Sequence, residues 1–154
     1  MKKVIVTGGS GFIGSNLVNF LIKKKYFVIN IDKLTYSSNN YSDKTRGSKN
    51  YKLFKIDINN QSKLIKIIQK TKPKAIFNLA AETHVDRSID GPKKFINTNI
   101  NGTFNLLECL RILKRKKITP KLIHISTDEV FGDIKHSLRS YEKNHCYRWV
   151  RFHR

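Results

Sequence analysis

Short apolar runs alternate with longer amphipathic stretches along residues 4–126. This alternation is typical of βαβ units, in which helices join parallel strands. It predicts five strands, at residues 4–7, 27–31, 53–58, 75–81 and 121–126. It also predicts helices at residues 12–24 and 61–72 and a long helix that begins at Pro92. The fold class is therefore α/β, a Rossmann-like doubly wound parallel sheet that is incomplete, with about five strands.

The long helix is expected to bury one apolar stripe against the sheet. That stripe comprises Ile96, Ile100, Leu106, Leu107, Leu110 and Leu113.

The pattern ends after Asp133, because residues 134–154 follow neither the helical nor the strand period. We therefore divide the chain into a domain at residues 1–133 and a basic C-terminal tail at residues 134–154. The tail has no apolar run to supply a further strand. We expect the strand at 121–126 to form an open edge of the sheet, and the fold to be marginally stable.

The net charge of +20 raises the question of nucleic-acid binding. Residues 1–133 contribute +15 and residues 134–154 contribute +5, and most lysines fall at helix ends or on outer faces. This distribution favours a charged surface over a nucleic-acid partner. No segment has the pattern of a membrane span or a signal peptide, so we expect a cytoplasmic protein. Cys109 and Cys146 form no C-x-x-C pair, and we expect no metal site.

A glycine-rich loop separates the first predicted strand from the first predicted helix. Gly8 permits a tight turn, Gly11 lets the backbone approach a pyrophosphate, and Gly14 lets the helix pack against the strand. The helix N-terminus then faces the negative charge. This context predicts a dinucleotide-binding domain.

An acidic residue, Asp32, closes the second predicted strand. A carboxylate at this place can accept hydrogen bonds from the adenosine ribose, and it repels a 2′-phosphate. The cofactor is therefore expected to be NAD rather than NADP, although Lys33 next to Asp32 weakens the inference. Asp57 follows the third strand in a similar way and can reach the adenine edge.

Three further motifs occur in a fixed order. They are residues 32–36, Asp-Lys-Leu-Thr-Tyr; residues 80–88, Ala-Ala-Glu-Thr-His-Val-Asp-Arg-Ser; and residues 126–133, Ser-Thr-Asp-Glu-Val-Phe-Gly-Asp. With the glycine loop, they make residues 1–133 resemble the dTDP-glucose 4,6-dehydratase family of the extended short-chain dehydrogenase/reductases. The tail resembles nothing in that family.

The resemblance implies NAD-dependent dehydration of a nucleotide-activated hexose by a lyase that is usually homodimeric. Elimination of water needs an acid and a base, and two carboxyl groups in different environments can divide these tasks. By the resemblance, Asp128 is the acid, Glu129 is the base and Thr127 hydrogen-bonds the sugar, with Thr83 on the substrate side. The implied NAD site comprises Gly8, Gly11, Phe12, Ile13, Gly14, Asp32, Lys33, Leu34, Thr35, Asp57, Ile58, Leu79, Ala80, Ala81 and Thr98.

The superfamily also uses a Tyr-x-x-x-Lys pair after the fifth strand, and no such pair follows Asp133. Tyr51 and Lys55 have this spacing, but they lie on the predicted third strand. A frameshift or premature end explains the tail, and we then expect negligible turnover. The alternatives are a divergent tail that binds a partner, a sugar-nucleotide epimerase of the same superfamily, or a non-catalytic nucleotide-binding fragment.

Overall fold

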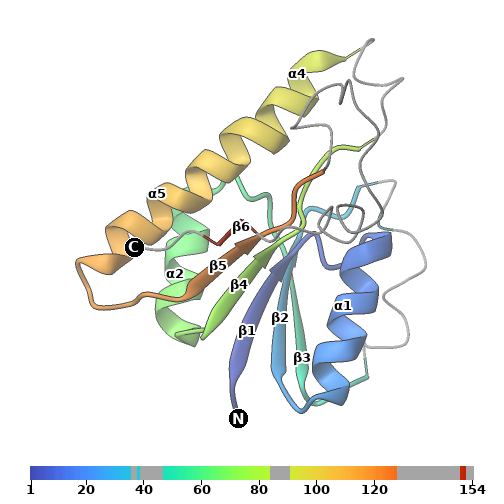
Figure 1. Cartoon of the computed structure of the whole chain (residues 1–154), viewed down its shortest axis with the longest axis vertical. Helices are drawn as coiled ribbons and strands as arrows, with labels where there is room; N and C mark the ends of the chain where they lie inside the picture. Colours follow the sequence, from blue (N-terminus) through green and yellow to red (C-terminus); the bar gives the residue numbers. More distant parts are fainter. Residues whose placement is uncertain (36–37, 39–46, 84–90, 128–149, 152–154) are drawn as a thin grey trace, which may run out of the picture.

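A single sheet of six strands organises the computed structural model (Figure 1), which describes residues 1–35, 38, 47–83, 91–127 and 150–151. The strands are β1 (Lys3–Thr7), β2 (Phe27–Asp32), β3 (Tyr51–Lys55), β4 (Ala75–Asn78), β5 (Lys121–His124) and β6 (Val150–Arg151). The helices are α1 (Phe12–Lys23), α2 (Gln61–Thr71) and a continuous helix made of α4 (Pro92–Phe95), the π-helical η2 (Ile96–Asn101) and α5 (Gly102–Lys114). No helix in the described ranges is long and apolar enough to cross a membrane.

The strand order is β3-β2-β1-β4-β5-β6, and the first five strands are parallel. The expected Rossmann-like α/β fold is therefore confirmed. The chain leaves β1 toward β2 on one side and later returns to β4 on the other side. This reversal places a topological switch point at the carboxyl ends of β1 and β4, where open α/β sheets bind their ligands.

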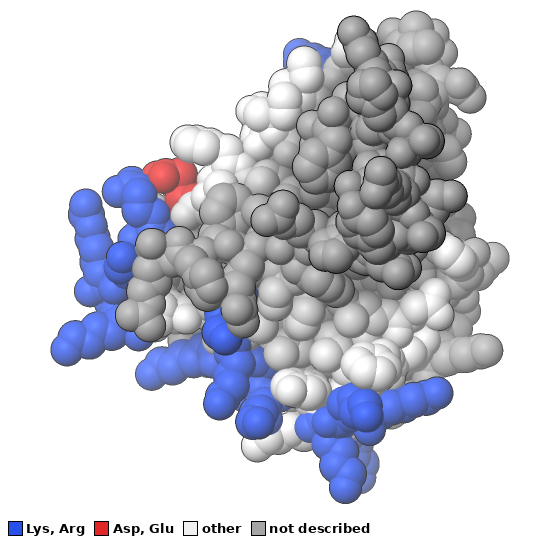
Figure 2. Space-filling model, in the orientation of Figure 1, with Lys and Arg blue, Asp and Glu red and all other residues white. Residues whose placement is uncertain are grey.

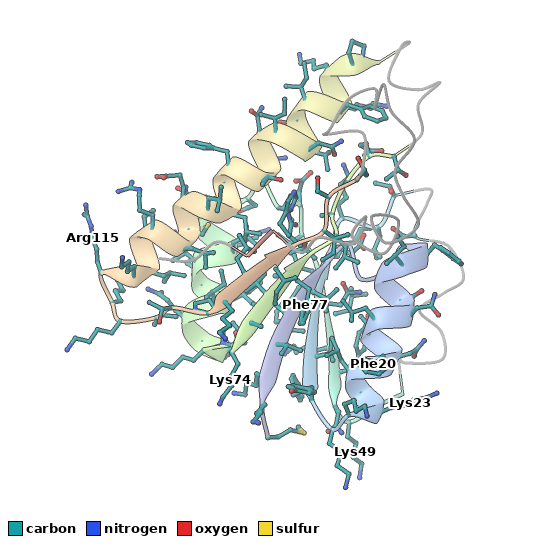
Figure 3. The ribbon with its side chains drawn as sticks, viewed as in Figure 1. Phe20, Lys23, Lys49, Lys74, Phe77 and Arg115 are labelled. Carbon is teal, nitrogen blue, oxygen red and sulfur yellow. The ribbon has the colours of Figure 1, made fainter. Side chains whose placement is uncertain are left out.

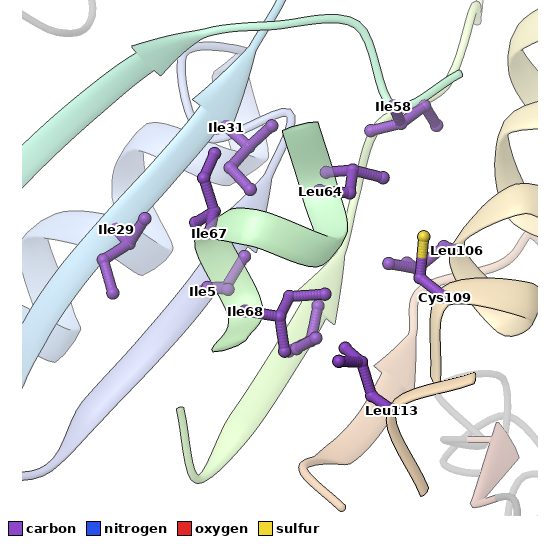
Figure 4. Packing of buried hydrophobic residues seen from close by; sticks show 11 residues of the cluster. Ile5, Ile29, Ile31, Ile58, Leu64, Ile67, Ile68, Leu106, Cys109 and Leu113 are labelled. Atoms are coloured by element: carbon purple, nitrogen blue, oxygen red, sulfur yellow. The ribbon is translucent and has the colours of Figure 1, made fainter. Parts of the chain in front are cut away.

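One face of the sheet is covered by α2 and α5, which pack against each other (Figure 4). The core on this face comprises Ile5, Ile29, Ile31, Ile58, Leu64, Ile67, Ile68, Ile76, Leu106, Cys109 and Leu113. Helix α2 begins after Asn60, whose side chain accepts a hydrogen bond from the Lys63 N–H, and ends before Pro73. Burial raises the pKa of the Cys109 thiol to about 11, so this side chain packs as a small apolar residue.

The opposite face is covered by α1, whose Val18 and Leu21 pack against Val4, Val6 and Val28. Strands β1 and β2 are thus buried on both faces. This is why residues 4–6 and 27–29 are continuously apolar rather than alternating.

The third strand lies earlier than predicted, at Tyr51–Lys55 rather than residues 53–58. It pairs with β2 so that Tyr51 lies opposite Val28 and Lys55 lies opposite Asp32. The apolar residues Ile56 and Ile58 continue beyond the strand. Strands β4 and β5 are also shorter than predicted, because the chain leaves the sheet toward the cavity described below.

The predicted inner stripe of the long helix is wrong at three positions. Ile96, Ile100 and Leu107 are exposed, whereas the buried positions are Thr98, Gly102, Leu106, Cys109 and Leu113. At about 100° per residue, Ile100 and Leu107 lie far around the helix from Leu113. Ile96 is the first residue of the π-helical segment η2, in the part of the long helix that extends beyond the strand ends (Figure 1).

The expectation of an open edge at β5 is also wrong. Strand β6 pairs antiparallel with β5, with Ile123 opposite Arg151 and His124 opposite Val150. The sequence pattern missed this strand because two residues are too short to show a period.

Candidate functional site

A cavity of about 500 Å³ lies at the carboxyl ends of the parallel strands. It is lined by Gly8, Gly11, Phe12, Ile13, Gly14, Ile31, Asp32, Lys33, Thr35, Ser38, Ile56, Asp57, Ile58, Leu79, Ala80, Ala81, Glu82, Thr83, Thr98, Ile125, Ser126 and Thr127. Its volume falls within the usual range for cofactor and small-molecule sites. Its position at the switch point is the one expected of a dinucleotide cleft.

The glycine loop forms one wall of this cavity and brings the start of α1 close to β1. Gly8 has a φ of +68° and lies against the backbone of Leu79 and Ala80, so only glycine fits there. Gly14 is buried directly against the backbone of Gly8. A side chain added at Gly11 would meet no atom nearer than the Gly8 carbonyl oxygen at 3.4 Å, so this position is open toward the cavity.

Asp32 ties the end of β2 to the glycine loop. It is 7% exposed, and its Oδ2 accepts a hydrogen bond from the Ser10 N–H at 2.9 Å. Its Oδ1 accepts from the Leu34 N–H at 2.8 Å and from the Ser38 hydroxyl at 3.2 Å. A carboxylate has about four acceptor positions. These three bonds therefore orient Asp32 and leave it capacity to accept from a ligand.

A buried amide supports the same loop from below. The Asn30 Nδ2 donates to the Ser10 hydroxyl and to the Tyr51 hydroxyl, each at 2.9 Å. Tyr51 thus belongs to the support of the loop, at the β3 edge of the sheet. Three strands separate β3 from β5, so Tyr51 and Lys55 cannot serve as the pair expected after the fifth strand.

Asp57 lies on the far wall of the cavity, where its Oδ1 accepts hydrogen bonds from the Asn59 N–H at 2.8 Å and from the Asn59 Nδ2 at 3.0 Å. The same Nδ2 donates to the Asn97 carbonyl at 3.1 Å. These contacts join the segment after β3 to η2 and hold this wall in place.

An ion pair crosses the cavity rim between β2 and the segment after β4. The Lys33 Nζ donates to the Glu82 Oε1 at 2.9 Å and to the Thr98 hydroxyl at 3.0 Å. The Glu82 backbone is itself held by the Asn99 side chain, which accepts from its N–H at 2.9 Å and donates to its carbonyl at 3.1 Å.

The charge of the cavity differs from that of the rest of the molecule. Among the described lining residues, Asp32, Asp57 and Glu82 are acidic and Lys33 is basic. In the view of Figure 2, lysines and arginines gather toward the opposite end, where Figure 3 labels Lys23, Lys49, Lys74 and Arg115. Among the residues that the structure describes, the basic charge is therefore not concentrated at the cavity.

Buried polar groups connect β1, β4 and β5 beneath the cavity. The Thr7 hydroxyl donates a hydrogen bond to the Asn78 Oδ1. The same hydroxyl accepts a hydrogen bond from the Ala80 N–H at 3.4 Å. The Asn78 Nδ2 lies 3.0 Å from the His124 Nδ1. Since an amide nitrogen only donates, the His124 Nδ1 accepts and the ring is neutral. Burial lowers the pKa of His124, in agreement with a neutral ring.

This contact predicts a pH-dependent stability. His124 in the unfolded chain takes up a proton near its ordinary pKa of 6.5, whereas the folded chain resists protonation. The free energy of unfolding should therefore fall as the pH decreases through and below 6.5. A His124→Gln variant should lose less stability than the parent chain between pH 7 and pH 5 in urea titrations. Equal losses in the two proteins would contradict this role for His124.

The structure brings together nearly all the residues that the sequence predicted for the site. Of the predicted NAD-site residues, only Leu34 does not line the cavity, and its backbone N–H donates to the Asp32 Oδ1. Thr83 and Thr127 line it as well, whereas Asp128 and Glu129 lie outside the described residues. Sequence reasoning missed Ile31, Ser38, Ile56, Glu82, Ile125 and Ser126. Glu82 lies within the motif at residues 80–88, which was the one available signal for it.

Residues 5–148 match the model of the family described as GDP-mannose 4,6 dehydratase. The match continues past residue 133 into the tail that the sequence led us to expect to be unmatched, and the domain boundary itself stays a prediction. The dTDP-glucose 4,6-dehydratase of Haemophilus influenzae is 43% identical over an alignment of 154 positions. This alignment covers 96% of this chain and 46% of the relative.

Solved structures show the same similarity. The dTDP-glucose 4,6-dehydratase DesIV of Streptomyces venezuelae, crystallised with NAD, is 35% identical with a TM-score of 0.79, over 89% of this chain and 43% of that one. A UDP-glucose 4-epimerase of Brucella ovis in complex with NAD is 27% identical with a TM-score of 0.72, over 88% and 39%.

The chain thus spans less than half the length of these relatives. The predicted resemblance to dTDP-glucose 4,6-dehydratases is confirmed, at higher identity than the resemblance to the epimerase. Since the family model covers most of its length, this chain belongs to the GDP-mannose 4,6 dehydratase family.

Proposed function

We propose that this chain is the NAD-binding part of a nucleotide-sugar dehydratase of the dTDP-glucose 4,6-dehydratase type. The observation that carries this proposal is the cavity at the switch point, where the glycine loop and Asp32 are joined by the Ser10–Asp32 hydrogen bond. The two relatives crystallised with NAD support the choice of cofactor.

The walls of the cavity fit the parts of NAD. The open position at Gly11 and the N-terminus of α1 would hold the pyrophosphate, because helix N-termini favour anions. The remaining acceptor capacity of Asp32 would hold the adenosine ribose, and Asp57 lies where the adenine edge would reach. Thr98 and residues 79–81 would line the rest of the site.

The proposed reaction is removal of water across C5 and C6 of a nucleotide-activated hexose. Bound NAD would supply a hydride acceptor for C4 and return the hydride to C6. Glu129 would take the C5 proton, and Asp128 would give a proton to the departing C6 hydroxyl so that water leaves. When the hydride returns to C6, Glu129 would give its proton back to C5. These two residues directly follow Thr127, which lies at the cavity and would hydrogen-bond the sugar, with Thr83 on the substrate side.

We further propose that this chain alone lacks dehydratase turnover, because no Tyr-x-x-x-Lys pair follows Asp133. In that superfamily the tyrosine takes the proton from O4 during oxidation. Loss of one general acid–base group typically costs about 10²- to 10⁴-fold in rate. The second candidate function is epimerisation, and the adjacent Asp128 and Glu129 favour dehydration because an epimerase needs no elimination pair.

Calorimetric titration of the chain with NAD⁺ and with NADP⁺ tests the proposed function. We expect weak binding of NAD⁺, and binding of NADP⁺ at least about tenfold weaker, because Asp32 repels a 2′-phosphate. Preference for NADP⁺ would contradict the role of Asp32. Absence of binding by either nucleotide would contradict the proposed function itself.

A further inference from the structure

We propose that Glu82 determines cofactor specificity by holding Lys33 away from the adenosine end of the cavity. This inference rests on the proposed function, since it concerns the choice between NAD and NADP. The sequence alone leaves that choice open because Lys33 directly follows Asp32. A carboxylate favours NAD, whereas a cation beside it can accept a 2′-phosphate.

Contacts in the structure account for the position of the Lys33 ammonium group. Its Nζ lies 2.9 Å from the Glu82 Oε1 and 3.0 Å from the Thr98 hydroxyl. The side chains of Lys33 and Glu82 are 33% and 11% exposed, so the carboxylate end of the pair is largely removed from water. Such shielding strengthens the attraction between the two charges relative to a fully exposed pair.

Glu82 is well placed to hold Lys33 because its own backbone is fixed. The Asn99 side chain makes hydrogen bonds to both the N–H and the carbonyl of Glu82, which pins this segment to η2. Thr98, the second acceptor for Lys33, lies on the same π-helical segment and is 5% exposed. Lys33 is therefore bound to a rigid wall rather than to a mobile side chain on the surface.

The local charge balance follows from this arrangement. While Glu82 neutralises Lys33, the negative charge of Asp32 faces an incoming ribose without compensation from its neighbour. The net charge of +20 would otherwise attract NADP⁺ more strongly than NAD⁺, because NADP⁺ carries an additional phosphate. Specificity for NAD thus depends on local pairing at the cavity rim.

Neutralising Glu82 should release Lys33. Lysine carries a point charge on a flexible four-carbon stem and binds phosphate groups well. Once released, the Lys33 ammonium group can turn toward the ribose next to Asp32, since Lys33 and Asp32 line the same cavity. Affinity for NADP⁺ should rise relative to that for NAD⁺.

The test compares the ratio of the Kd values for NADP⁺ and NAD⁺ in the whole chain and in its Glu82→Gln variant. We expect the ratio to fall by about tenfold, which corresponds to about 1.4 kcal/mol. Glu108→Gln is the matched control, because Glu108 lies on α5, pairs with Arg111 and does not line the cavity. An unchanged ratio in Glu82→Gln, or an equal fall in Glu108→Gln, would overturn the inference.

A second variant separates the holding of Lys33 from the direct repulsion of a phosphate by Glu82. In a Lys33→Met background, Glu82→Gln should change the ratio by about twofold or less, because no ammonium group remains to be released. A full tenfold change in that background would overturn the holding role. Both nucleotides are measured on the same protein, so partial unfolding of a variant lowers both affinities and leaves the ratio unchanged. If the parent chain binds neither nucleotide, the proposed function fails instead.

Discussion

Gly14→Ala is expected to destabilise the chain by about 3 kcal/mol and to lower its Tm by about 10 °C. A Cβ at this buried position would overlap the carbonyl oxygen of Gly8 and lie 2.8 Å from the Gly9 Cα. Both are backbone atoms, which cannot rotate away as a side chain can. Helix α1 would have to move off β1, with loss of the contacts that Val18 and Leu21 make with β1 and β2. Thermal denaturation followed by circular dichroism measures the effect.

Gly11→Ala is the matched control within the same loop. Its added methyl group would lie 3.4 Å from the Gly8 carbonyl oxygen, and the φ of Gly11 is −77°, which alanine adopts readily. We expect a loss of about 1 kcal/mol or less, because Gly11 precedes α1 and alanine is a poorer N-cap than glycine. Affinity for NAD⁺ should nevertheless fall by about tenfold or more, since the methyl group faces the cavity. Equal melting of Gly14→Ala and Gly11→Ala would contradict the packing described for Gly14.

The central strands and the glycine loop could be predicted from the sequence because their physical causes are local. Val4, Val6, Val28 and Ile29 are each 2% exposed or less, so burial on both faces leaves a continuous apolar run. Gly8 and Gly14 are required by close backbone contacts that other residues do not fit.

The edge strands were harder to predict because burial is incomplete at an edge. In β3 each residue is at least partly exposed, and Lys52 and Lys55 are the most exposed. Its position is set by pairing with β2, while Ile58 is buried in the core beyond the end of the strand. Apolar character therefore indicated core packing here rather than strand structure.

The supporting polar contacts of the site could not be predicted, because their partners are distant in the sequence. Lys33 and Glu82 are 49 positions apart, and Thr7 and Asn78 are 71 positions apart. Neither pair has a spacing that marks it. The sequence indicates which residues have suitable chemistry, and the strand order determines which of them meet.

The buried face of the long helix was also mistaken in part, since leucine occurs on both of its sides. Leu106 is 1% exposed and packs in the cluster with Leu113, whereas the adjacent Leu107 is 36% exposed. Leu107 lies on the side of the helix that also exposes Ile100 and Phe104. The sequence pattern identified both residues as apolar but did not fix the rotation of the helix about its axis. Both leucines were therefore assigned to the core.

Substitution of these two neighbours should produce sharply different losses of stability. Leu106→Ala removes a fully buried side chain from among the residues of α2 and the sheet, and should cost about 3 kcal/mol. Leu107→Ala should cost less than about 1 kcal/mol, because Leu107 is 36% exposed and belongs to neither buried cluster. Both changes occur in the same turn of α5 and replace leucine by alanine, so their effects on helix propensity are the same and the difference reports burial alone. Urea denaturation of the two variants measures that difference. A loss of 3 kcal/mol in Leu107→Ala would restore the stripe that the sequence pattern predicted and contradict the helical phase of the structure.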